Sequence, residues 1–188
     1  MFEEKIELPE QKTEFPYSSP MYLYIPVGRL IFLSIFSFHL YEAYWIYKNW
    51  QYLKKRKGLN IRPFWRGVFG VLFCHSLFRM IYNDEEAIAI KQPTFSPKKQ
   101  GNYFVTLSIG SGLINRAKNF WAGVLMPFVP SYLAFVPVQK YINEITEKRN
   151  PTQQYYKWSW GHILCIIYGT LFWGLILPAI FLKLKMMF

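Results

Sequence analysis

Residues 36–66 read FSFHLYEAYWIYKNWQYLKKRKGLNIRPFWR: an apolar helical stretch, a belt of aromatic residues, a basic run and a second aromatic start. Aromatic rings that carry a polar edge are stable where a bilayer meets water, and lysine and arginine gather in cytoplasmic loops. This stretch therefore predicts a helix leaving a membrane, a cationic loop, and a second helix that re-enters.

The rest of the chain repeats this alternation of apolar and polar blocks. Its 188 residues are 52% hydrophobic and 20% aromatic. A helix needs roughly 20 apolar residues to cross the hydrocarbon. The predicted fold is an all-α, polytopic helical membrane bundle of about four transmembrane helices, at residues 22–50, 64–82, 120–138 and 158–182. These belong to a single integral-membrane domain, residues 21–188, behind a polar tail (residues 1–20) that is predicted to be disordered.

One apolar segment is ambiguous. Residues 103–114 would form a helix of roughly 18 Å, which is too short to cross a bilayer alone. The segment is therefore predicted to be interfacial or re-entrant, and the alternative is a fifth span. The choice decides whether the carboxyl end lies outside (four spans) or inside (five spans).

Orientation follows from the distribution of positive charge. Residues 48–66 hold seven Lys/Arg residues, against two in the tail. The positive-inside rule then places this loop in the cytoplasm and the amino terminus outside. The net charge of +11 is concentrated between apolar blocks, where anionic headgroups account for it, so no nucleic-acid partner is expected. The predicted site for anionic lipid or for a membrane-protein partner consists of Lys54, Lys55, Arg56, Lys57 and Arg66.

A polar cluster inside the apolar blocks is the sharpest candidate for chemistry. His39 and Glu42 are three residues apart on one helix face. His39 and His75 each lie nine residues inward from a basic marker residue, which predicts similar depths in the membrane. The favoured interpretation is an interhelical clamp with a Glu42–His75 hydrogen bond, since ionisable groups in membranes usually pair. A proton or ion pathway is one alternative. A metal or haem site with His39, Glu42 and His75 as candidate ligands is the other.

Four strings resemble a group of small bacterial inner-membrane proteins of unknown function. The strings are YWIYKNW (44–50), RPFWR (62–66), LFCHSLF (72–78) and PVQKYINEI (137–145). The resemblance implies helical spans and a bacterial inner-membrane location, and it supplies no activity. The group has glycine in place of His39 and tyrosine in place of His75, which weakens a metal site, and a longer apolar run near residues 103–114, which favours five spans.

The function predicted from these features is that of a non-enzymatic, multi-pass inner-membrane accessory or interaction protein. No catalytic residues, no bound cofactor and no metal are assigned. The two alternatives are a small transporter or channel that uses the Glu/His cluster, and a metal- or haem-binding membrane protein. Both cysteines, Cys74 and Cys165, are expected to be buried small side chains rather than a disulfide.

Overall fold

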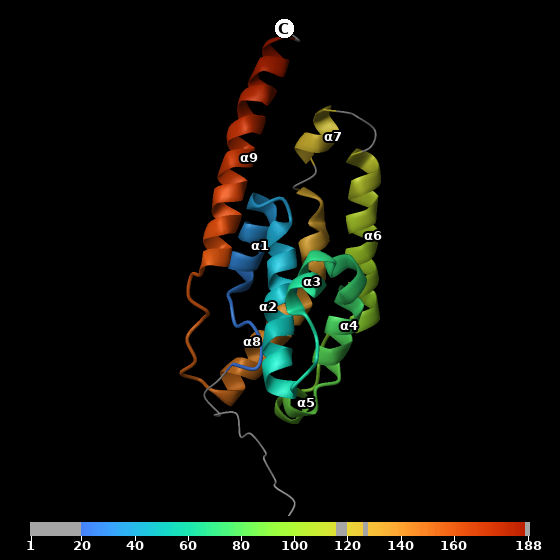
Figure 1. Ribbon diagram of the computed structural model, residues 1–188, viewed down its shortest axis with the longest axis vertical. Coiled ribbons are helices and arrows are strands. Elements are labelled where there is room, and N and C mark those ends of the chain that lie inside the picture. The colour runs from blue at the N-terminus through green and yellow to red at the C-terminus, as the bar shows by residue number, and fades with distance from the viewer. Residues whose placement is uncertain (1–19, 116–119, 126–127, 187–188) are drawn as a thin grey trace, which may run out of the picture.

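A computed structural model describes residues 20–115, 120–125 and 128–186 (Figure 1). The predicted disordered tail lies almost wholly outside the described residues. The described part of the chain is all-α, as predicted, without strands. Its elements are α1 (Val27–Phe36), α2 (Leu40–Lys57), α3 (Pro63–Val68), α4 (Gly70–Tyr82), α5 (Glu85–Ile90), α6 (Pro97–Asn115), α7 (Phe120–Leu125), the 3-10 helix η2 (Pro130–Ala134), α8 (Val136–Arg149) and α9 (Trp160–Lys185).

The first predicted span, residues 22–50, is not one continuous helix, because the chain reverses inside it. Phe38 and His39 both have a positive φ, at 50° and 67°, a conformation that is uncommon outside glycine. Ser37 stabilises the reversal, since its hydroxyl accepts from the amide of Tyr41 at 3.0 Å and donates to the carbonyl of Leu33 at 2.6 Å. Helices α1 and α2 therefore form a hairpin and lie side by side (Figure 1).

The second predicted span, residues 64–82, is also divided. The chain bends at Phe69, so that α3 and α4 are separate helices. The longer of the two, α4, has 13 residues and measures about 20 Å, which is short of a bilayer. Gly67 brings α3 against α2, because a Cβ there would lie 2.7 Å from the Cβ of Tyr47.

The described residues of the third predicted span, residues 120–138, belong to three separate elements, and proline explains part of the division. Pro130 begins η2, and Pro137 lies in the first turn of α8, positions that suit a residue without an amide hydrogen. Helix α7 is described over six residues, Phe120–Leu125. The ambiguous segment, residues 103–114, lies within the 19-residue helix α6.

The last predicted span, residues 158–182, lies almost entirely within a single long helix, α9. It has 26 residues, about 39 Å, and Ser159 caps its first turn reciprocally with His162. Its most apolar window has a mean hydropathy of 2.2, and only 11% of that window is buried. Among the described residues it is the one helix long and apolar enough to cross a membrane. The structure supports membrane association through this helix, and a bundle of several spans is not shown.

The core lies around α2, toward the end of the molecule that holds α5 and α8 (Figure 1). Trp45, Phe78 and Phe135 pack edge to face, with ring centroids 5.0 to 6.3 Å apart. Trp45 and Trp50, predicted as interfacial anchors, are fully buried. The aromatic belt of the sequence is therefore partly a protein core, because α2 is surrounded by other helices.

Candidate functional site

The structure brings His39 and Glu42 together at the α1–α2 reversal, as their spacing predicts. The Nδ1 atom of His39 lies 2.9 Å from Oε1 of Glu42. The third member is Ser131 of η2, which the sequence did not reveal. Its hydroxyl lies 2.8 Å from Glu42 Oε1 and 3.0 Å from His39 Nδ1.

This trio does not have the geometry of a nucleophile, base and acid relay. In such a relay the two imidazole nitrogens contact different partners, the hydroxyl on one side and the carboxylate on the other. Here the same nitrogen, Nδ1 of His39, faces both Ser131 and Glu42. The arrangement instead ties η2 to the reversal.

His75 does not join the cluster, so the predicted Glu42–His75 hydrogen bond is wrong. His75 Nε2 lies 2.9 Å from Oδ1 of Asn102 on α6. Gly101 permits this approach, since a Cβ there would lie 2.3 Å from the imidazole ring. The equal-depth prediction assumed two straight spans, and the bend at Phe69 removes that assumption. Among the described residues no group of three or more metal-ligating side chains occurs.

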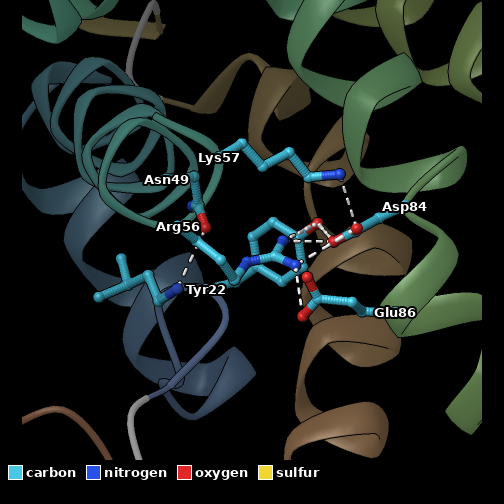
Figure 2. A network of polar contacts seen from close by, with 7 residues as sticks. Tyr22, Asn49, Arg56, Lys57, Asp84 and Glu86 are labelled. Carbon is cyan, nitrogen blue, oxygen red and sulfur yellow. Dashed lines mark hydrogen bonds and ion pairs between the residues drawn. The ribbon is translucent and has the colours of Figure 1, made fainter. Parts of the chain in front are cut away.

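The predicted lipid site on the basic run is only partly available. Arg56 is 8% exposed and forms ion pairs with Asp84 and with Glu86, the latter at 3.1 Å (Figure 2). Lys57 contacts the same Asp84 carboxylate at 2.8 Å. Both cations thus pair with a buried carboxylate, and of the two only Lys57 keeps substantial exposure, at 31% of its side chain.

The other three predicted lipid ligands are placed differently. Lys54 and Lys55 are exposed, although the Lys54 ammonium donates to the carbonyl of Ile61 at 2.9 Å. The guanidinium of Arg66 lies over the ring of Trp50, 4.2 Å from its centroid. Arg66 is thus half-buried against an aromatic core residue.

Asp84 is the centre of that network, and its side chain is fully buried (Figure 2). Burial by itself raises the pKa of a carboxyl group. Hydrogen bonds from Arg56, Lys57 and Tyr22 outweigh burial and hold the pKa of Asp84 below its usual value. Burial and the Asp84 charge in turn raise the pKa of the Tyr22 phenol.

The network is a structural latch, which we call the Asp84 latch and define as Tyr22, Arg56, Lys57, Asp84 and Glu86. It joins the segment before α1, the end of α2 and the start of α5 (Figure 2). The sequence contained its signal, an acidic triplet at 84–86 that balances the basic run, but no local pattern shows that the two meet.

An open cavity of about 600 Å³ lies where α9 begins. We call it the α2–α9 groove. Its walls come from α2, α3 and the first turns of α9. The lining side chains are mostly apolar or aromatic, and the lining residues are Leu40, Ala43, Tyr44, Tyr47, Lys48, Phe64, Gly67, Val68, Ser159, Trp160, Gly161, Leu164 and Cys165. A volume of this size is typical of small-molecule and cofactor sites.

Lys48 is the one charged side chain in the groove lining. Its ammonium donates to the Gln51 side chain at 3.2 Å and lies 5.3 Å from the ring centroid of Tyr156. Burial works against ionisation of the Tyr156 phenol, yet Lys48 and neighbouring hydroxyls outweigh it and lower its pKa. Lys48 therefore brings a positive charge to the groove lining, next to the Tyr156 ring.

Both cysteines are free and buried, as predicted.

Comparison with known proteins gives no match to a family profile, to a curated protein or to a solved structure. Function therefore has to be inferred from the geometry of the chain itself.

Proposed function

We propose that the protein is a non-enzymatic accessory protein of a bacterial inner membrane, anchored by α9, with its charged end in the cytoplasm. The observation that carries this proposal is that the exposed apolar surface of α9 and the charged Asp84 latch lie apart. Exposed apolar side chains such as Leu171, Leu175 and Phe181 follow α9, whereas the Asp84 latch lies at the opposite end of the molecule (Figure 1). An exposed apolar helix of this length is stable in hydrocarbon, and an ion network is not.

The α1–α2 hairpin would enter the bilayer without crossing it. Phe36, at its tip, packs against Gly169 in the first half of α9, and the indole of Trp173 donates to the Phe36 carbonyl at 3.2 Å. Non-helical backbone is tolerated at membrane depth where protein covers it. Lys183 and Lys185, near the end of α9, are suited to reach the far headgroups.

This arrangement changes the expected orientation of the amino-terminal segment. Tyr22 contacts Arg56, so both belong to the same side of the membrane. The exposed lysines at 54 and 55 favour the cytoplasm for that side. The accessory role would be carried by this charged end, which offers a surface to anionic lipid or to a membrane-protein partner.

Topology mapping tests the proposal. In a full-length background with Cys74→Ala and Cys165→Ala, single cysteines are placed by Glu10→Cys, Lys55→Cys or Lys185→Cys. In intact spheroplasts an impermeant maleimide should label only Lys185→Cys, and after lysis all three should react. Labelling of Glu10→Cys from outside, or release of the protein by an alkaline wash, would contradict the proposal.

The transporter and metal-protein alternatives lose the observation that motivated them. Both relied on His75 joining His39 and Glu42, and His75 instead contacts Asn102. They would regain support from solute flux in liposomes or from stoichiometric metal in the purified protein.

A further inference from the structure

We propose that the α2–α9 groove binds one acyl chain of an anionic phospholipid, with its phosphate held at Lys48. The inference deepens the proposed function, since it rests on the start of α9 lying at the cytoplasmic interface. It differs from the lipid site expected on the basic run, because Arg56 and Lys57 belong to the Asp84 latch.

Two glycines shape the groove by letting the helices that form its walls approach α2. A Cβ at Gly161 would lie 2.1 Å from the Tyr44 ring, so α9 begins directly against α2. Gly67 makes the same close approach from α3. The cavity is thus built by helix contacts on both sides rather than by a gap between loose segments.

The chemistry of the lining runs from polar to apolar along α9. Ser159 and Trp160 lie at one end, and the Ser159 hydroxyl is 2.8 Å from the Tyr44 hydroxyl. One turn further on, Leu164 is 59% exposed and lines the groove. A tryptophan at the start of a membrane helix is typical of the headgroup level, and the leucine then lies in hydrocarbon. This order matches a phospholipid, with its phosphate at Ser159 and Lys48 and its chain along Leu164.

The charge of Lys48 is not neutralised by a carboxylate among the described residues, which sets it apart from Lys57. It contacts an uncharged amide, Gln51, and the faces of tyrosine rings. A second cation, Arg29, lies beyond Tyr156, where it donates to that residue's carbonyl at 2.6 Å. Such a site favours an anionic phosphate over a zwitterionic headgroup, whose own ammonium would be repelled.

The test measures lipid binding to the delipidated full-length protein in detergent by native mass spectrometry. The probes are dioleoyl phosphatidylglycerol and dioleoyl phosphatidylcholine. The wild type should bind one phosphatidylglycerol about five-fold more tightly than phosphatidylcholine, which is the effect of one cation near a headgroup. Lys48→Gln should remove this preference, whereas Lys140→Gln, which removes an exposed charge from α8 outside the groove, should retain it.

A second pair of variants tests the chain-binding part. Leu164→Trp fills the groove and should weaken binding of both lipids. Leu175→Trp adds the same bulk to an exposed position of α9 outside the groove and should change neither. Thermal midpoints confirm that each variant is folded.

The proposal is overturned if Lys48→Gln behaves like Lys140→Gln, or if Leu164→Trp behaves like Leu175→Trp. Either result would mean that lipid covers α9 without a defined site. Because binding is measured in micelles, it is independent of the topology experiment. A failed topology prediction would leave a positive lipid result standing, and the reverse also holds.

Discussion

Asp84 is the buried centre of the Asp84 latch, and Asp84→Asn is therefore the most informative stability variant. Its carboxylate is fully buried and contacts Arg56, Lys57 and Tyr22 (Figure 2). The substitution keeps the shape of the side chain but removes its charge. Arg56, whose side chain is 8% exposed, then keeps Glu86 as its remaining partner of opposite charge among the described residues. The side chain of Glu86 is 59% exposed.

Removing one partner of a buried ion pair costs about 3 to 5 kcal/mol, because the other charge stays buried. The remaining Arg56–Glu86 pair at 3.1 Å offsets a little of this cost, so we expect the lower end, about 3 kcal/mol. For a chain of this size that loss lowers the thermal midpoint by roughly 6 to 12 °C. The matched control is Glu86→Gln, which removes a solvent-screened carboxylate and should cost less than about 1 kcal/mol.

The pH dependence of the same variant gives a second check. The pKa of Asp84 is lowered in the folded protein, so its contribution to stability is present above the unfolded pKa of about 3.9. It is lost as the pH falls through the lower folded value. The wild-type midpoint, measured by circular dichroism in detergent, should therefore fall between pH 5 and pH 3, and Asp84→Asn should fall less. Equal midpoints for Asp84→Asn and Glu86→Gln at pH 7 would refute a central role for this carboxylate.

Two further variants probe packing. Gly169→Ala should lower the thermal midpoint by several degrees, because its Cβ would lie 2.4 Å from the carbonyl oxygen of Phe36. The control Gly174→Ala, which has open space around it, should leave the midpoint unchanged. Equal midpoints for the two variants would contradict the α1–α9 contact. Gln139→Leu should cost about 1 to 3 kcal/mol in chemical denaturation, because the buried indole of Trp45 loses its acceptor at 2.6 Å. A neutral result there would mean that water replaces the amide.

The sequence was sufficient for features that depend on local pattern. Helix α9 follows from the uncharged apolar block at residues 158–182, and this needs no knowledge of the rest of the fold. The His39–Glu42 contact follows from a separation of three residues, although His39 lies in the reversal just before α2 rather than on the helix. In both cases the interacting residues are close in the chain.

The reversal at Ser37–His39 could not be predicted in this way. Glycine, asparagine or proline usually marks a turn, and here a phenylalanine and a histidine adopt positive φ. A hydropathy profile counts apolar residues along the sequence and carries no information on where the chain reverses. A hairpin of two short apolar helices therefore has the same profile as one long membrane span. The Asp84 latch was missed for a related reason, because Arg56 and Asp84 are 28 residues apart.

The hairpin and the latch support each other, and this is the strongest reason to abandon a straight first span. In a continuous helix Tyr22 and Arg56 would lie about 50 Å apart, on opposite sides of a bilayer. Instead the Arg56 guanidinium donates to the Tyr22 hydroxyl at 3.1 Å, and the Leu23 amide donates to Asn49 at 3.1 Å. Both contacts require the chain to return on itself between these residues. The Asp84 latch thus holds the hairpin closed at its open end, while the packing of Phe36 against α9 holds its tip.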